Sequence, residues 1–191
     1  MGAVESQAGR SRRAAAGIAL LAVSGLCLLG AVRAEGALLG TNDLTTFAFT
    51  SQGCSVNPSC TFTQTKHPTA VVKAPFTGRI TKWRLALRLV GTAQLAVMRR
   101  VPGGEFKTLR TSEAQTETIV GKYVYPTDLR IKRRQLIGIT LSDGATVGKF
   151  DEVGAVRKGF VPALGPGETS APDPSFSSPD ETLQFNATLR R

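Results

Sequence analysis

The chain has 191 residues, enough for one domain with its own core, and its hydrophobic fraction of 41% excludes a wholly disordered protein. One histidine and three cysteines leave little material for a metal site, so we expect neither a metal nor another cofactor. The formal net charge of +10, from 24 Lys and Arg against 14 Asp and Glu, favours anionic partners without specifying a fold.

The amino terminus has the layout of a secretory signal peptide. Basic residues up to Arg13 precede a long apolar run, and a Val-Arg-Ala sequence ending at Ala34 places compact residues at the two positions that determine cleavage. We therefore predict a signal helix within residues 1–34 and a single mature domain over residues 35–191, secreted or held in the cell envelope. The alternative is an uncleaved membrane anchor, because the apolar run approaches the ~20 residues that span a bilayer.

Two cysteines remain after signal cleavage, and they flank a turn built on Asn57-Pro58. In an exported protein such a pair normally forms a disulfide. A redox or nucleophilic cysteine would need closer spacing or a basic partner. We therefore predict a structural disulfide between Cys54 and Cys60.

The clearest secondary-structure signal runs from Gly78 to Leu109. Its first part alternates the apolar Trp83, Leu85, Leu87 and Leu89 with Arg84, Ala86 and Arg88. This period of two places one face against a core and the other in water. With glycine breaks at Gly91 and Gly103-Gly104, the pattern predicts an antiparallel meander in which Trp83 is a core residue.

The remaining elements are short and are separated by turn residues. We expect a loose lead-in over 35–42, strands over 44–50, 61–65, 70–74, 116–125, 149–156 and 183–189, a turn at Pro126-Thr127, and a long Pro/Gly/Ser-rich loop over 161–180. The runs over 129–131 and 136–141 should form a further strand pair or one bent strand. About nine or ten short strands, with no helix outside the signal, predict an all-β fold. The expected architecture is an antiparallel β-sandwich resembling a jelly roll, and a Greek-key barrel is the alternative.

The densest positive charge consists of Arg130, Lys132, Arg133 and Arg134, with Arg84, Arg88, Arg99 and Arg100 as companions if they share a face. Such a face would bind an acidic glycan, an anionic lipid or polyphosphate. The alternative is a solvated strand face that also blocks edge pairing. Nucleic acid is disfavoured, because few aromatic residues lie among the charges.

No catalytic motif stands out. The sole histidine, His67, lies in an expected turn, and no nucleophile elbow accompanies it. Asp151 and Glu152 would point to opposite faces of a strand. The sequence Asn186-Ala-Thr188 matches a glycosylation sequon but falls in a predicted strand. We therefore assign no catalytic residues, although two carboxylates distant in the sequence could still form a glycosidase pair.

Several short segments together resemble a group of exported single-domain β-sandwich proteins of high-GC Gram-positive bacteria. They are the Cys54–Cys60 loop and residues 74–83, 95–99, 136–138, 162–165 and 183–187. The resemblance implies an exported β-sandwich and carries over no catalytic residues. This chain has Arg134-Gln135 where members of the group often have Gly-Asp, which enlarges the basic cluster.

Three functions follow as expectations. The first is an exported, non-catalytic β-sandwich module that binds an acidic glycan, an anionic lipid or an envelope protein. The second is a secreted glycan hydrolase with a jelly-roll cleft, and the third is a structural component of the envelope. A basic face would favour the first, a cleft with two acids the second, and a large exposed apolar patch the third.

Overall fold

The computed structural model describes residues 36–42, 44 and 50–191 of the chain. Two predictions therefore lie outside the described residues, namely the signal helix within 1–34 and most of the strand expected over 44–50. No helix in the described part of the chain has the length and hydropathy that crossing a membrane requires.

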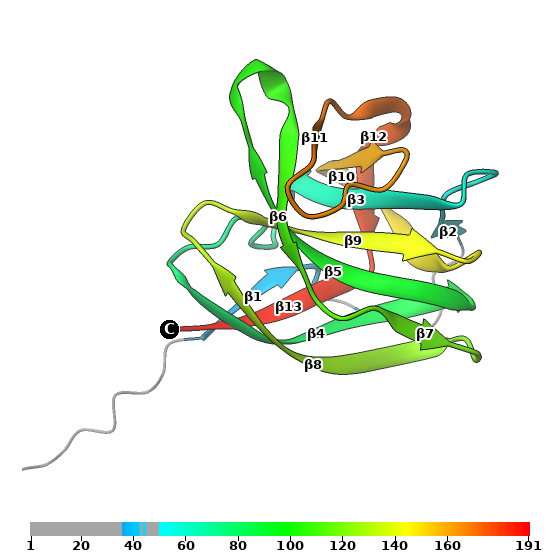
Figure 1. Cartoon of the computed structure of the whole chain (residues 1–191), viewed down its shortest axis with the longest axis horizontal. Coiled ribbons are helices and arrows are strands. Elements are labelled where there is room, and N and C mark those ends of the chain that lie inside the picture. The colour runs from blue at the N-terminus through cyan, green and yellow to red at the C-terminus, as the bar shows by residue number, and fades with distance from the viewer. Residues whose placement is uncertain (1–35, 43, 45–49) are drawn as a thin grey trace, which may run out of the picture. The chain divides into compact units, whose positions relative to one another are not determined.

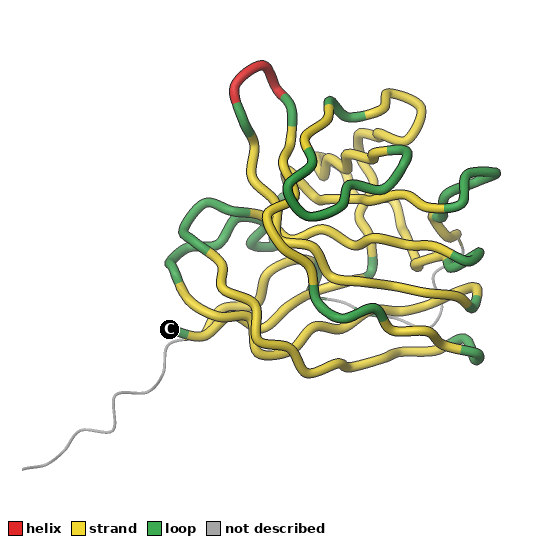
Figure 2. The backbone as a smooth tube through the Cα atoms, in the orientation of Figure 1, coloured by secondary structure: helices red, strands yellow, loops and turns green. Residues whose placement is uncertain are grey.

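Antiparallel β-strands make up most of the described structure, which confirms the predicted all-β class (Figure 1). The strands are β1 (Gly36–Gly40), β2 (Thr50–Gln52), β3 (Ser59–Lys66), β4 (Gly78–Leu89), β5 (Gly91–Arg100), β6 (Phe106–Thr111), β7 (Gln115–Glu117), β8 (Gly121–Ile131), β9 (Leu136–Ser142), β10 (Thr146–Phe160), β11 (Thr169–Ser170), β12 (Asp173–Leu183) and β13 (Phe185–Arg190). Within residues 36–42, 44 and 50–191, the one helical element is the short turn η1 (Pro102–Gly104), drawn in red in Figure 2.

The strands form one antiparallel sheet that does not close on itself. Its main path runs β1-β13-β4-β10-β3-β9-β5-β6-β11, and β2, β7, β8 and β12 pair with strands of this path. The described strands at the two ends of the path, β1 and β11, do not pair with each other, which disagrees with a closed Greek-key barrel. The long strand β10 pairs along its length with β2, β3, β4 and β12, so it ties together segments far apart in the chain.

Trp83 belongs to the main apolar core, as the period-two pattern predicted. Its side chain is 0% exposed, and Leu85 and Leu87 are buried in phase with it. The indole packs against Tyr125 of β8, with 4.6 Å between the ring centroids. Burial, together with the hydrogen bond that Tyr125 donates to Glu117, raises the pKa of this phenol. The tyrosine is therefore a neutral core residue at ordinary pH.

A second, smaller apolar cluster lies on the opposite face of β5. Leu95 and Val97 point into the main core, whereas Ala96 and Met98 point into the second cluster, because successive side chains of a strand alternate between faces. This second cluster consists of Ala96, Met98, Phe106, Leu136, Phe160 and Leu164. The segment after β10 covers it, and the amide of Leu164 donates a hydrogen bond to Thr61 at 3.1 Å.

The predicted meander is only half correct. β5 and β6 form the expected hairpin around η1, but β4 and β5 are not paired with each other, and β5 pairs instead with β9. At Gly91 the chain leaves β4 with φ near 141°, and a Cβ there would lie 2.6 Å from backbone atoms of Asp143 and Ala145. The absence of a side chain at Gly91 thus lets the β4–β5 connection run close to the backbone of the turn between β9 and β10, and β4 and β5 do not form a hairpin.

Two segments that contain proline are strands, contrary to prediction. β8 continues through Pro126 with a register shift against β4, and β12 includes Pro174 and Pro179 in the segment expected to be a loop over 161–180. Each of these strands is paired on one side only, β8 with β4 and β12 with β10. Proline is tolerated on such an edge, because its missing N–H would face solvent rather than a partner strand.

Three further expectations were wrong in detail. The lead-in over 35–42 contains β1, which pairs with β13. The strand expected over 70–74 is reduced to a single bridge between Lys73 and Leu136. The two runs around 129–141 belong to β8 and β9, which pair with different neighbours. In each case the hydrogen-bonding partner is distant in the chain, so local sequence carries little of the information.

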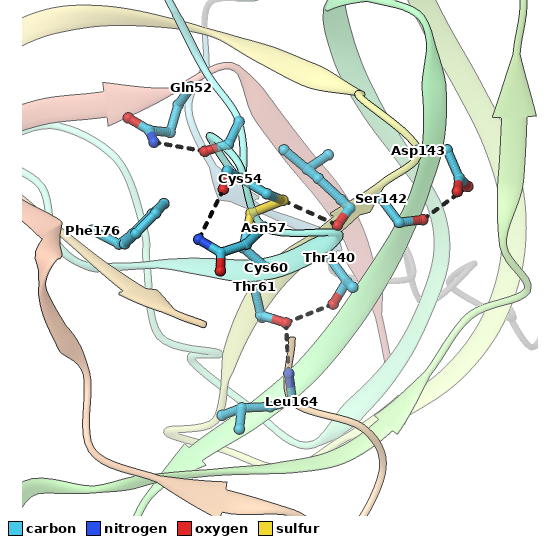
Figure 3. Close-up of a disulfide and its surroundings, with 12 residues drawn as sticks. Gln52, Cys54, Asn57, Cys60, Thr61, Thr140, Ser142, Asp143, Leu164 and Phe176 are labelled. Carbon is cyan, nitrogen blue, oxygen red and sulfur yellow. Dashed lines mark hydrogen bonds between the residues drawn. A yellow bond between two sulfur atoms is a disulfide. The ribbon is translucent and has the colours of Figure 1, made fainter. Parts of the chain in front are cut away.

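Cys54 and Cys60 form the predicted disulfide, with 5.2 Å between their Cα atoms (Figure 3). The loop between them is shaped by Asn57, whose backbone and side-chain amides both donate to the carbonyl of Cys54 at 3.0 and 3.3 Å. Cys60 is in β3 at the edge of the main core, so the bond fixes the start of a central strand.

Removing this bond with the Cys54→Ala/Cys60→Ala variant is expected to lower the free energy of unfolding by about 2 kcal/mol, because a short loop gains entropy in the unfolded chain. For a domain of this size the melting temperature should fall by about 4 to 8 °C. Thermal unfolding followed by circular dichroism would measure the change. Wild-type protein treated with a reductant should show the same fall, and an unchanged melting temperature in both samples would contradict the role of the bond.

Candidate anion-binding site

A pocket of about 850 Å³ gathers seven cationic side chains from different parts of the chain. It lies where the end of β5 and the start of β9 meet the turn between β8 and β9. The β5–β6 hairpin, which projects at the top of Figure 1, lies beside it. Seven cationic side chains line it: Lys73, Arg99, Arg100, Lys132, Arg133, Arg134 and Lys158. The seven cations therefore come from parts of the chain that are up to 85 residues apart, from Lys73 to Lys158.

The β8–β9 turn holds three of these cations in a fixed backbone conformation. The amide of Lys132 donates to Oε1 of Gln135 at 2.8 Å, and the amide of Arg133 donates to Oγ1 of Thr77 at 3.1 Å. The amide of Arg134, a residue with φ near 70°, donates to the carbonyl of Ala74 at 2.8 Å. The turn is thus anchored at successive residues, while all three cationic side chains are exposed.

Arg99 and Arg100 reach the same place from the end of β5. The register pairs Met98 with Leu136, the first residue of β9, so the two arginines lie beside the residues that precede β9. They also pair with Lys107 and Phe106 of β6. The hairpin therefore presents Arg99 and Arg100 next to the Lys132–Arg134 turn.

Lys73 and Lys158 complete the cationic lining, and the sequence did not indicate either of them. Lys73 bridges to Leu136, and Lys158 lies opposite Thr63 in the β10–β3 pair. Alternation along a strand predicts that Lys158 and Phe160 share one face of β10. The sequence does not show that this face lies beside the turn of Lys132, Arg133 and Arg134.

The other residues that line the pocket are neutral. Leu136 and Phe106 belong to the second apolar cluster. The other neutral lining residues are Thr65, Gly104, Gln135, Pro172, Pro174 and Ser177. No carboxylate lines the pocket among the described residues.

The ion pairs of the described chain lie elsewhere. They join Arg79 to Asp128, and Lys149 and Arg157 to Glu181. Across residues 36–42, 44 and 50–191, none of the seven pocket cations forms an ion pair. Seven like charges around one concavity, without a neutralising acid, create a positive potential that attracts anions.

Three predicted anion-binding residues are outside this lining. Arg84 donates from Nη1 to Oδ1 of Asn186 at 3.1 Å and to Oγ1 of Thr188 at 3.3 Å, so it joins β4 to β13. Arg88 is exposed near the end of β4, and Arg130 is exposed on β8 opposite Arg79. The predicted cluster is therefore divided, since only Lys132, Arg133 and Arg134 of the original set, with Arg99 and Arg100, meet at one site.

The structure also places the residues that the sequence left without a role. Asn186 of the sequon is 3% exposed, and its Nδ2 donates to the carbonyl of Thr41 at 2.9 Å, so it acts as a structural link. His67 shapes a turn, because its Nδ1 accepts from the amides of Thr69 and Ala70 at 3.2 and 3.0 Å.

A second pocket, of about 590 Å³, lies beside the disulfide loop. Its lining includes one carboxylate among the described residues, that of Asp143, so neither pocket presents a carboxylate pair of the kind that glycosidases use. The described residues also contain no group of three or more His, Cys, Asp or Glu placed to hold a metal ion.

Comparison of the chain with protein-family models, with curated proteins and with solved structures finds no match. The functional assignment therefore rests on the pocket, its residues and their charges.

Proposed function

We propose that this protein is an exported, non-catalytic module that binds an anionic ligand in the basic pocket. The observation that carries the proposal is the lining itself, with seven cations and no described carboxylate around about 850 Å³. Mutual repulsion among those cations destabilises the empty site, and an anion relieves the repulsion as it binds. The four arginines are well suited to this task, since the guanidinium fork can donate two parallel hydrogen bonds to a phosphate or carboxylate.

The signal-like amino terminus and the disulfide support a location outside the cytoplasm, secreted or in the envelope, where a disulfide persists. For the scaffold we propose a jelly-roll-like β-sandwich, which is supported by the open antiparallel sheet around one large apolar core. In that setting the partner would be an acidic glycan, an anionic lipid or an envelope protein. The absence of a carboxylate pair in either described pocket disfavours the glycan hydrolase.

A structural envelope component is the second candidate, and one surface feature favours it. Leu89 and Val90 are exposed in the β4–β5 connection, and Ile119 and Val120 are exposed before β8. The pairings of β4 with β8 and of β5 with β7 bring these connections to the same end of the sheet. Exposed aliphatic side chains gathered in this way are typical of contact surfaces between subunits.

The test compares three purified proteins. The pocket variant is Arg99→Gln/Arg100→Gln/Arg133→Gln, and the control variant is Lys122→Gln/Arg130→Gln/Arg190→Gln, which removes the same charge from exposed residues outside the pocket. We expect the wild type to bind at least one of three ligands: polygalacturonate, phosphatidylglycerol vesicles or inorganic triphosphate. The pocket variant should bind that ligand at least about tenfold more weakly, because charge-assisted contacts are lost.

Binding should also weaken between low and moderate salt, because the pocket cations are solvent-accessible and the Debye length shortens to about 8 Å at 0.15 M. The control variant should match the wild type at each salt concentration. Equal losses in the two variants would mean that net charge alone matters, and absence of binding by the wild type would move the structural role ahead.

A further inference from the structure

We propose that the ligand of the basic pocket is a chain of closely spaced phosphates rather than a glycan with separated carboxylates. This inference rests on the anion-binding function proposed above and names the chemistry of its ligand. Three features of the pocket favour such a chain: the density of its positive charge, the nature of its neutral lining residues and the placement of its donors.

The density of positive charge in the pocket favours a ligand with closely spaced anionic groups. A sphere of 850 Å³ is about 12 Å across, and the seven cations lie around a space of that size. An acidic glycan separates its carboxylates by whole sugar rings, so it would bring few charges into such a space and leave several cations facing one another. A chain with charge on each successive phosphate brings several charges into the same width and neutralises more of the lining.

The neutral residues of the lining disfavour a ligand that binds by stacking a ring. Proteins commonly hold sugar rings and bases by stacking them on exposed aromatic faces. The described lining offers one aromatic residue, Phe106, which is 4% exposed and packs in the second apolar cluster against Phe160. With no exposed ring available there, recognition depends on charge and hydrogen bonding. Thr65 and Ser177 each donate their hydroxyl hydrogen to a backbone carbonyl, that of Val156 at 3.2 Å and that of Asp173 at 2.7 Å, so the cations are the main donors that remain for a ligand.

The distribution of the donors around the pocket favours an extended ligand. The cations come from four elements: Arg99 and Arg100 from the hairpin, Lys132 to Arg134 from the turn between β8 and β9, Lys73 from its bridge to Leu136, and Lys158 from β10. One compact anion could contact only part of this set. A flexible chain of phosphates can contact several of these elements at once, and the anchored backbone of the turn reduces the entropy lost on binding.

Isothermal titration calorimetry in buffer without divalent cations tests the inference with orthophosphate, pyrophosphate, inorganic triphosphate and trigalacturonate. Trigalacturonate carries three carboxylates on separate rings, so it matches triphosphate in the number of anionic groups but not in their spacing. We expect affinity to increase about tenfold or more with each added phosphate, and triphosphate to bind at least about tenfold more tightly than trigalacturonate. The pocket variant should lose at least about a hundredfold in triphosphate affinity, whereas the control variant should retain it.

Two further ligands distinguish the sources of clustered phosphate. ATP that binds no more tightly than triphosphate would support a free phosphate chain, and ATP that binds at least about tenfold more tightly would support a nucleotide with the same phosphate chemistry. Phosphatidylglycerol vesicles carry isolated phosphates, so binding to vesicles without binding to triphosphate would overturn the inference.

The remaining outcomes separate this inference from the general function. Trigalacturonate binding that exceeds triphosphate binding and is lost in the pocket variant would overturn the phosphate-chain inference and leave anion binding intact. Triphosphate binding that is equal in the wild type and the pocket variant would overturn both. Thermal unfolding of all three proteins would first establish that each variant is folded, so that a loss of affinity reports on the pocket.

Discussion

The Trp83→Ala variant is expected to have a free energy of unfolding about 3 to 5 kcal/mol below that of the wild type. Trp83 is fully buried in the main core and packs against Tyr125, so its removal takes away a large apolar surface and leaves a cavity in the main core beside Tyr125. The chain has one tryptophan, so the variant has no tryptophan fluorescence with which to follow unfolding. Urea unfolding of both proteins should therefore be followed by circular dichroism.

Two controls identify the cause of that loss. The Trp83→Phe variant should be affected less, because it keeps an aromatic ring and removes an indole Nε1 that is buried without a hydrogen-bond partner. Val124→Ala changes a side chain that is 59% exposed on the neighbouring strand and should cost less than about 0.5 kcal/mol. A loss below about 1 kcal/mol in Trp83→Ala would contradict the central position of the indole.

Replacing Glu181 with glutamine is expected to destabilise the protein by about 2 to 4 kcal/mol at neutral pH. Glu181 binds two cations, accepting from Nζ of Lys149 at 2.6 Å and from Nη2 of Arg157 at 2.6 Å. The Arg157 side chain is 5% exposed, lies over the ring of Phe62 and also donates to the carbonyl of Phe176. Glutamine would leave this buried guanidinium without its counter-charge, and chemical unfolding would measure the loss.

The same residue predicts how stability depends on pH. Burial raises the pKa of Glu181, but the hydrogen bonds and charges of Lys149 and Arg157 outweigh that effect, so the net pKa lies below its ordinary value. A lowered pKa in the folded state contributes stability above the unfolded value of about 4.3, and this contribution is lost as pH falls through the folded pKa. The difference in stability between the wild type and Glu181→Gln should therefore be largest near neutral pH and decrease steadily below about pH 4.

An exposed ion pair serves as the matched control for Glu181. Asp128 pairs with Arg79, and the two side chains are 66% and 56% exposed. Arg79 holds the pKa of Asp128 below its ordinary value through a hydrogen bond, but solvent screens such a pair. Asp128→Asn should leave stability unchanged within error. A loss equal to that of Glu181→Gln would mean that burial does not determine the contribution of these pairs.

The strand content, the buried tryptophan and the disulfide could be predicted from the sequence, because each depends on local pattern. Alternation of apolar and polar residues identifies a strand and its buried face whatever the partner strand is. The two cysteines are close in the chain, so their pairing needs no long-range information. Local pattern was misleading at Pro126 and in β12, because proline is compatible with an edge strand and the sequence does not reveal which strands are edges.

For the candidate site, local sequence accounts for the close spacing of Lys132, Arg133 and Arg134. Which other charges join them depends on the pairing of the strands. The sheet places Arg99 and Arg100 beside the turn, adds Lys73 and Lys158, and leaves Arg84 and Arg130 elsewhere. Antiparallel pairing joins segments that are distant in the chain. A charge cluster therefore forms according to the strand register and to the end of the sheet at which each strand stops, and local sequence specifies neither.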